Sequence, residues 1–421
     1  MKKLSLLAIL RIDYHPKERD ASRKNLRVAM WNMNYRNNNG NNDLSILGFG
    51  CMRFPKRGNS FDMEEVEREI LHAIEMGVNY FDTAYIYTGS EEALGTVLAK
   101  NNCREKIHIA TKLPHHMMKT RAEMEKHFKE QLARLKTDYV DYYLMHMLPD
   151  VKTWNALIER GALDWLTELK AAGKIRKLGF SYHGSTHTFQ ELLNVYDWDF
   201  CQIQYNYMDE NSQAGRAGLL AAAEKGIPVI IMEPLRGGRL VNDLPKKALE
   251  AFSSTKEQRS PAEWALRWLW NQKEVSVVLS GMNSMKMLDE NIRIASEMQA
   301  GSLTEEELAI YEEAKAAINE KIKVPCTGCS YCMPCPSGVD IPGSFRCYNV
   351  SYTDGYASGM REYFMCTTMK AQKSNVSRCV ECGKCEMHCP QGISIRKELK
   401  NVRRRFENPV YKLIARVIPH A

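Results

Sequence analysis

The chain has 421 residues, of which 44% are hydrophobic and 26% are charged, so it is long enough for one large or two medium cores and is neither disordered nor fibrous. Its formal net charge is +7, but residues 1–42 and 391–421 each carry an excess of six positive charges, which leaves the intervening chain acidic by five. Basic chain ends of this kind do not indicate sequence-specific recognition of DNA or RNA, and we expect no nucleic-acid partner.

Residues 1–43 are expected to form an irregular leader. The opening MKKLSLLAIL resembles a secretion signal, but Arg11 and Asp13 interrupt its apolar run and no small-residue cleavage pattern follows. Five asparagines and a glycine over residues 37–42 then act as a polar breaker. Because no run of eighteen apolar residues occurs anywhere, we expect no membrane partner, and a cytoplasmic protein.

Residues 44–300 alternate short apolar runs with stretches of helical period, which predicts eight repeated strand-helix units. The predicted strands are Ser45–Gly50, Asn79–Thr83, Ile107–Lys112, Val140–His146, Arg176–Ser181, Phe200–Tyr205, Pro228–Glu233 and Ser276–Gly281. The clearest predicted helices are Met63–Met76, Ala122–Leu135, Asn155–Ala172, Ala217–Lys225 and Ala262–Asn271.

This size and repeat favour an α/β fold, a (β/α)8 TIM barrel. An open doubly wound sheet is the alternative, but such sheets usually carry G-x-G-x-x-G after the first strand, and GFGCMRF lacks its third glycine. A polar helix, Thr304–Lys321, then fills a connecting segment over residues 301–324, and a small α-rich domain follows over residues 325–421.

Ionisable side chains stand at the ends of three successive predicted strands, where a barrel of this kind places its active site. Asp82 ends the second strand, and Tyr87 lies in the loop that follows it. Lys112 and His146 end the third and fourth strands. Burying a lone aspartate or lysine is costly, so we expect Asp82 and Lys112 to form an ion pair.

These four residues predict hydride addition to a carbonyl. A tyrosine has a pKa of about 10 and becomes a useful acid when a cation favours its phenolate, which we expect Lys112 to do for Tyr87. Tyr87 would then protonate the developing alkoxide while a ring N–H of His146 holds the carbonyl. Taken singly, each residue also fits a structural role, such as a helix cap or a core histidine.

The segment FDTAYIYTGSEEALG resembles the D-T-A-x-x-Y-G-x-S-E signature of the aldo-keto reductase family, with Thr88 inserted before Gly89. ATK and LMH are similar to the family's lysine and histidine positions. The resemblance implies nicotinamide-dependent, reversible reduction of aldehydes or ketones, with Asp82, Tyr87, Lys112 and His146 as the catalytic residues. The implied substrate is a small carbonyl or alcohol.

The same resemblance implies a set of cofactor-binding positions. Ser181 and Gln204 match the carboxamide-binding residues, and PLRGG matches the pyrophosphate loop. The family's stacking tyrosine is replaced by Met232, and the basic residues that often bind the 2′-phosphate appear as Gly281 and Met287, so both NADP and NAD are candidates. The implied cofactor residues are Gly50, Met52, Ser181, Gln204, Met232, Pro234, Leu235, Gly237, Gly238, Gly281, Asn283, Glu290 and Asn291.

Eight of the thirteen cysteines fall in two short runs near the C-terminus, which indicates metal binding. CVECGKCEMHCP has the C-x-x-C-x-x-C-x-x-x-C-P spacing of bacterial ferredoxins, whose fourth cysteine binds the other cluster. CTGCSYCMPCP is one residue short in its last gap. We therefore expect a ferredoxin-like domain with two 4Fe-4S clusters, and zinc is the alternative. The expected ligands are Cys326, Cys329, Cys332, Cys335, Cys379, Cys382, Cys385 and Cys389.

The expected crossed arrangement assigns Cys335 to the cluster of Cys379, Cys382 and Cys385, and assigns Cys389 to the other cluster. The whole chain resembles the aldo-keto reductases that carry a C-terminal ferredoxin-like domain. Three hypotheses for the clusters stay open: they are structural, they relay electrons from an electron-transfer protein, or the barrel is only a scaffold for an electron carrier without carbonyl turnover.

Overall fold

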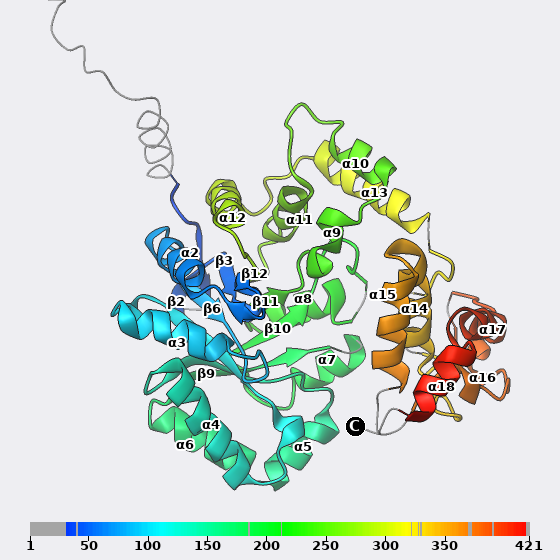
Figure 1. Cartoon of the computed structure of the whole chain (residues 1–421), viewed down its shortest axis with the longest axis horizontal. Helices are drawn as coiled ribbons and strands as arrows, with labels where there is room; N and C mark the ends of the chain where they lie inside the picture. Colours follow the sequence, from blue (N-terminus) through cyan, green and yellow to red (C-terminus); the bar gives the residue numbers. More distant parts are fainter. Residues whose placement is uncertain are drawn as a thin grey trace, which may run out of the picture.

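Eight parallel strands close into a barrel in the computed structural model, which describes residues 31–38, 41–183, 186–211, 213–320, 322–326, 328, 331–368, 373–389 and 391–417 (Figure 1). The barrel strands are β3 (Leu47–Gly50), β6 (Tyr80–Asp82), β7 (His108–Leu113), β8 (Val140–Met145), β9 (Ile175–Tyr182), β10 (Phe200–Gln204), β11 (Val229–Met232) and β12 (Val275–Ser280). The predicted barrel is confirmed, and each strand lies within two residues of its expected bounds.

Helices surround the barrel, and their apolar faces pack against the outer surface of the strands (Figure 1). They are α2 (Met63–Glu75), α3 (Ser90–Lys100), α4 (Arg121–Leu135), α5 (Val151–Glu159), α6 (Ala162–Ala171), α7 (Thr186–Leu192), α8 (Gly215–Glu224), α9 (Arg239–Asn242), α10 (Lys246–Phe252), α11 (Pro261–Trp270) and α12 (Met285–Glu297). Large side chains fill the barrel interior, where the Tyr142 ring packs edge-on against Tyr80 and Phe200. The barrel is therefore a packed core with its polar groups at the ends of the strands.

One long predicted helix is two helices in the structure. Residues 155–172 were expected to be continuous, but α5 ends at Glu159 and α6 begins at Ala162. Gly161 between them has φ 81°, a left-handed conformation that glycine adopts without strain and that ends an α-helix. The prediction of a single helix is wrong because the apolar period continues across this break.

A hairpin precedes the barrel where the sequence pattern predicted only an irregular leader. Strands β1 (Tyr35–Asn38) and β2 (Asn41–Ser45) pair antiparallel. Arg36 of the hairpin donates hydrogen bonds to backbone carbonyls in the segment that leads into β12, including Gln272 O at 2.6 Å. The expectation of an irregular leader is therefore wrong for residues 35–38 and 41–43, because tertiary hydrogen bonds stabilise a polar segment that has no apolar pattern. Residues 1–30 of the expected leader lie outside the described residues.

The C-terminal region is helical and packs to one side of the barrel (Figure 1). Its helices are α13 (Glu305–Asn319), α14 (Ile341–Thr353), α15 (Tyr356–Tyr363), α16 (Lys384–Met387), α17 (Ile395–Phe406) and α18 (Pro409–Val417). A separate apolar core that includes Phe345, Tyr363 and Phe406 holds α14, α15 and α17 together. Within the described ranges, no helix has the length and apolar character needed to cross a membrane.

Candidate active site and cysteine cavity

Asp82 and Lys112 form a buried ion pair at the carboxyl-terminal end of the barrel. Lys112 Nζ lies 2.6 Å from Oδ1 of Asp82 and also donates to the carbonyl oxygen of Thr83 at 2.7 Å. The exposed fractions of the two side chains are 1% for Lys112 and 5% for Asp82. The neighbouring strands β6 and β7 bring the residues together, so the structure contains the ion pair that the sequence predicted.

Tyr87 and His146 lie beside this pair. Lys112 Nζ lies 5.0 Å from the centroid of the Tyr87 ring. The rings of Tyr87 and His146 are 6.2 Å apart and nearly perpendicular. His146 directly follows β8, and its backbone N–H donates to the carbonyl oxygen of Leu113 at 3.0 Å, which orients it toward the same mouth. Four residues from three successive β/α units therefore converge, as the sequence predicted.

The electrostatics of Tyr87 differ from the sequence-based expectation. Lys112 is the largest influence and lowers the pKa of the Tyr87 phenol, but burial and the carboxylates of Asp82 and Glu233 outweigh it, so the pKa lies above its ordinary value. For Lys112, burial lowers the pKa, but Asp82 and Tyr87 raise it further, and the net direction is upward. The group therefore carries a protonated phenol next to a charged lysine.

Ser181, Gln204 and Met232 lie on three neighbouring strands at the same end of the barrel. In the register of the sheet, Gln204 lies opposite Met232, and Ser181 lies opposite Gln202 on β10. Gln204 Nε2 donates to Oδ2 of Asp209 at 2.6 Å, whereas its buried Oε1 accepts no hydrogen bond from the described residues. A free acceptor of this kind fits the amide N–H of a nicotinamide carboxamide.

The loop after β11 contains the predicted pyrophosphate residues Pro234, Leu235, Gly237 and Gly238, and its backbone is unusual. Gly237 and Gly238 have φ 71° and 97°, and the non-glycine residues Glu233 and Arg236 also have positive φ, at 54° and 47°. Left-handed conformations are costly for residues with a Cβ, so contacts from outside the loop must hold it in place.

Two residues outside the loop that sequence reasoning missed, Arg53 and Asp209, provide such contacts. Arg236 forms an ion pair with Asp209, with 2.9 Å between Nε and Oδ2. Arg53, an exposed residue next to the predicted Met52, donates from Nη1 to the carbonyl oxygen of Gly237 at 3.1 Å. The sequence indicates their role only weakly, because they are isolated charged residues in loops after strands. Arg53 and Arg236 place two guanidinium groups at the predicted pyrophosphate loop.

The remaining predicted cofactor residues lie at the ends of β3 and β12, in the loops that follow these strands, and on α12. A Cβ at Gly50 would lie 3.2 Å from the carbonyl oxygen of Ser280, and a Cβ at Gly281 would lie 3.5 Å from Cδ of Arg53. Met52 and Asn283 are exposed. On α12, Asn291 donates to the Ser280 hydroxyl at 2.7 Å and Glu290 accepts from the Ser260 hydroxyl at 2.5 Å, so both side chains already have partners within the protein.

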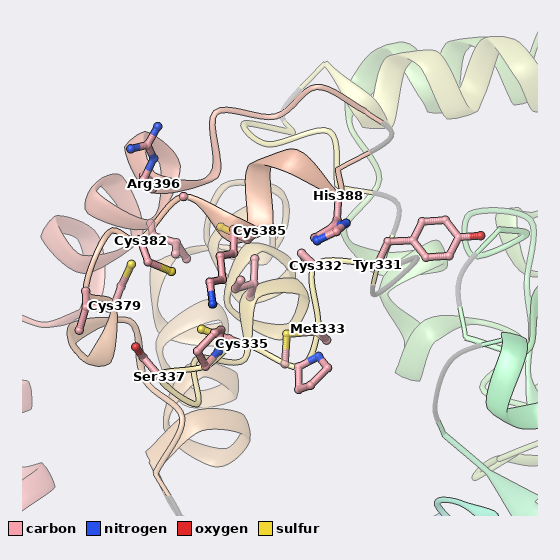
Figure 2. Close-up of a pocket in the computed structure, with 17 residues that line it drawn as sticks. Tyr331, Cys332, Met333, Cys335, Ser337, Cys379, Cys382, Cys385, His388 and Arg396 are labelled. Carbon is pink, nitrogen blue, oxygen red and sulfur yellow. The ribbon is translucent and has the colours of Figure 1, made fainter.

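Five cysteines from the two sequence runs line one cavity of about 320 Å³ in the C-terminal domain (Figure 2). They are Cys332, Cys335, Cys379, Cys382 and Cys385. Cys335 therefore lies with Cys379, Cys382 and Cys385, as expected for the crossed arrangement, and Cys332, which that arrangement assigns to the other cluster, lines the same cavity. Cys326 and Cys389 pack against the core of the same domain, and Cys329 lies outside the described residues.

The cysteine thiols surround this cavity and do not converge on a point. Among the described residues, no three His, Cys, Asp or Glu side chains are close enough together to hold a single metal ion. A cubane holds its thiolates farther apart than one ion does, because irons and sulfides lie between them. Five cysteine side chains around one cavity therefore fit an iron-sulfur cluster.

The structure therefore joins a closed (β/α)8 barrel, with buried ionisable residues at its mouth, to a helical domain that contains a cysteine-lined cavity. The aldo/keto reductase family model matches residues 46–316, and a model described as a 4Fe-4S dicluster domain matches residues 325–394. The chain belongs to the aldo/keto reductase family and carries a C-terminal 4Fe-4S dicluster domain. The resemblance found in the sequence is confirmed.

Relatives share this barrel at moderate sequence identity. The aldo-keto reductase yakc of Schizosaccharomyces pombe, whose name specifies NADP(+), is 25% identical over 60% of this chain and 84% of its own length. The aldo-keto reductase str7 of Strobilurus tenacellus is 28% identical over 64% of this chain and 88% of its own. The holo form of an aldo-keto reductase from Bacillus halodurans matches at 26% identity and a TM-score of 0.55, covering 67% of this chain and 96% of that one.

Proposed function

We propose that this protein reduces a small aldehyde or ketone with a nicotinamide cofactor, and catalyses the reverse oxidation of the alcohol. The observation that carries the proposal is the convergence of Tyr87 and His146 on the buried Asp82–Lys112 pair at the mouth of the barrel. The Tyr87 phenol, the Lys112 ammonium group and the His146 imidazole lie close together, and such groups can stabilise the negative charge that develops on a carbonyl oxygen during reduction.

The residues of the chain act on the proton and on the carbonyl oxygen. The nicotinamide, when bound, supplies a hydride to the carbonyl carbon. Tyr87 donates its phenolic proton to the carbonyl oxygen, and the nearby Lys112 ammonium group stabilises the phenolate that results. His146 holds the same oxygen through a ring N–H, and Asp82 keeps Lys112 in position. Solvent then returns the proton to Tyr87.

Features of the described residues support nicotinamide binding at this mouth. The free Oε1 of Gln204 suits an amide donor, and the hydroxyl of Ser181, which accepts a 2.8 Å hydrogen bond from the Met147 N–H, lies on the neighbouring strand. Arg53 and Arg236 supply positive charge for a pyrophosphate. The S. pombe relative is named for NADP(+), which supports NADPH as the first cofactor to test and NADH as the second.

The C-terminal domain, in this proposal, holds two 4Fe-4S clusters. Cys379, Cys382, Cys385 and Cys335 would bind one, and Cys326, Cys329, Cys332 and Cys389 the other. Clusters of this type transfer single electrons, whereas hydride transfer moves two, so the clusters serve the domain's structure or exchange electrons with a partner protein. Reduced thiols and such clusters suit a reducing compartment such as the cytoplasm.

An anaerobic titration with NADPH and then NADH tests this function, with nicotinamide fluorescence and cluster absorbance followed in the same cuvette and carbonyl turnover assayed afterwards. We expect tight binding of one nucleotide without cluster bleaching, followed by carbonyl-dependent oxidation of that nucleotide. Binding of neither nucleotide would instead support the alternative, an iron-sulfur electron carrier whose barrel is a scaffold.

A further inference from the structure

Arg239 joins the barrel to the cysteine domain at the start of α9, one residue after the glycines of the pyrophosphate loop. Its Nη1 lies 2.7 Å from Oδ2 of Asp354, and its Nη2 lies 2.8 Å from Oε1 of Glu362. Asp354 directly follows α14, and Glu362 belongs to α15. The exposed fractions of the three side chains are 26%, 11% and 17%, so water screens this group less than it screens a surface ion pair.

The loop of residues 233–238, which Arg239 directly follows, has a backbone conformation that requires stabilising contacts from other segments. Four of the six residues from Glu233 to Gly238 have positive φ, and two of them carry a Cβ. Contacts from within the barrel come from Asp209 and Arg53, which bind Arg236 and Gly237. Arg239, which directly follows the same loop, adds a contact with a different domain through its ion pairs with Asp354 and Glu362. A nucleotide that requires this loop conformation binds more tightly when the loop is already held in it.

We propose that Arg239 is a positioning residue for the nucleotide site, and that the ion pairs with Asp354 and Glu362 allow the cysteine domain to set nucleotide affinity. The inference rests on the proposed nicotinamide function of the barrel. Arg239 acts through the backbone of the loop, because both terminal nitrogens of its guanidinium group are paired with carboxylates of the other domain.

The cysteine domain has a continuous path of packing to these carboxylates. Cys332, Cys335, Cys379 and Cys385 pack against an apolar core that includes Phe345 of α14 and Tyr363 of α15. Helix α14, which Asp354 follows, and helix α15, which contains Glu362, therefore share this core with the cysteines. Because metal binding and folding are coupled in small metal domains, occupancy of the cysteine sites affects how firmly Asp354 and Glu362 hold Arg239.

The test compares Asp354→Asn with the unmodified protein, both as full-length chains with reconstituted clusters and equal iron content. Asp354 is the better position, because Glu362 also lies 3.6 Å from Arg346. NADPH affinity is measured by anaerobic fluorescence titration, and its dissociation rate by stopped flow. We expect at least about fivefold weaker binding, mainly through faster dissociation, and no further loss when Arg239→Gln is added. Equal affinity in Asp354→Asn and the unmodified protein would overturn the proposal.

A matched control is Glu320→Gln, which removes a 2.7 Å ion pair between the end of α13 and Lys247 of α10, away from the loop. It should leave NADPH affinity unchanged, and an equal loss in this variant would overturn a specific role for Arg239. Hydrogen exchange without nucleotide provides a second readout. In Asp354→Asn the amides of Gly238 and Leu240, which donate to Leu235 O, should exchange faster.

The two readouts separate the two proposals. Failure of the unmodified protein to bind NADPH and NADH would contradict the nicotinamide function, and hydrogen exchange would still decide whether Asp354 orders the loop. Unchanged exchange at Gly238 and Leu240 would overturn the positioning role whatever the nucleotide result.

Discussion

The ammonium group of Lys112 lies 2.6 Å from Asp82 Oδ1 and 5.0 Å from the centroid of the Tyr87 ring. The cation is therefore closer to the carboxylate than to the phenol ring. This difference explains why Lys112 lowers the pKa of Tyr87 but does not prevent burial and Asp82 from raising it overall. In this state Tyr87 is protonated at neutral pH, so a proton is present for an oxygen that develops negative charge.

Tyr87→Phe removes the proposed proton donor. We expect carbonyl reduction to fall by at least about a thousandfold, because proton donation contributes roughly this much in comparable sites. NADPH affinity should change little. Tyr85→Phe is a matched control, since the Tyr85 hydroxyl donates to Glu130 on α4, outside the proposed site, and should retain activity. Steady-state rates of Tyr87→Phe equal to those of the unmodified protein would refute the assignment.

The raised pKa of Tyr87 predicts how activity depends on pH. Reduction requires the protonated phenol, so kcat/KM for reduction should stay level through neutral pH and fall only above pH 10, the ordinary value for tyrosine. Alcohol oxidation requires the phenolate and should rise over the same range. Paired pH profiles in both directions check this, and a fall in reduction below pH 8 would contradict it.

Lys112→Met tests the buried pair through stability. The substitution leaves the Asp82 carboxylate buried without its partner, so we expect a loss of roughly 3 kcal/mol, and Asp82→Asn combined with Lys112→Met should cost less than the sum of the single changes. Lys100→Met is the control, because the Lys100 side chain that pairs with Glu67 is exposed to water, so its loss should change the unfolding midpoints little. Thermal and urea unfolding midpoints give the comparison.

Glu69 on α2 predicts a pH-dependent stability that has no connection with catalysis. Its side chain is buried, neither carboxyl oxygen has a hydrogen-bond partner among the described residues, and burial followed by the charge of Glu65 raises its pKa to about 7. Between about pH 4.5 and pH 7 the unfolded chain has lost a proton that the folded chain keeps, so the unfolding free energy falls as pH rises.

Glu69→Gln should remove this dependence and stabilise the protein above pH 7, by no more than about 3 kcal/mol. The measurement is the unfolding midpoint from pH 5 to pH 8. Glu64→Gln, at an exposed position in the first turn of the same helix, should leave the slope unchanged. A Glu69→Gln variant that loses stability at pH 8 would show that the carboxylate has a partner we have not identified.

Cys335→Ala tests the crossed arrangement of cluster ligands. Cys335 belongs to the first cysteine run but lines the cavity with Cys379, Cys382 and Cys385. We expect Cys335→Ala and Cys379→Ala to lose the same cluster, so that each variant retains about four of an expected eight irons per chain. The buried Cys347→Ala, on α14, is the control and should retain all of the iron. Different cluster spectra in the two cavity variants would contradict the shared site.

Much of the barrel could be predicted because its signals are local. Apolar runs of strand length mark segments buried on both faces, and each of the eight barrel strands carries one. The single prediction for residues 155–172 failed because the left-handed Gly161 interrupts a continuous apolar period. The hairpin at residues 35–45 was missed because Arg36 stabilises it through carbonyls more than two hundred residues away in sequence.

The two cysteine runs could be identified from spacing alone, because their residues lie close together in the chain. Asp82, Lys112 and His146 could be identified because each lies at the end of a predicted strand, and Tyr87 because it lies in the segment that resembles the family signature. Tertiary structure decided the rest. It brought Arg53 and Asp209 to the glycine loop, and it paired Arg239 with the cysteine domain. It also set the direction of the Tyr87 pKa. These properties depend on burial and on distances between distant segments, which no local pattern of residues records.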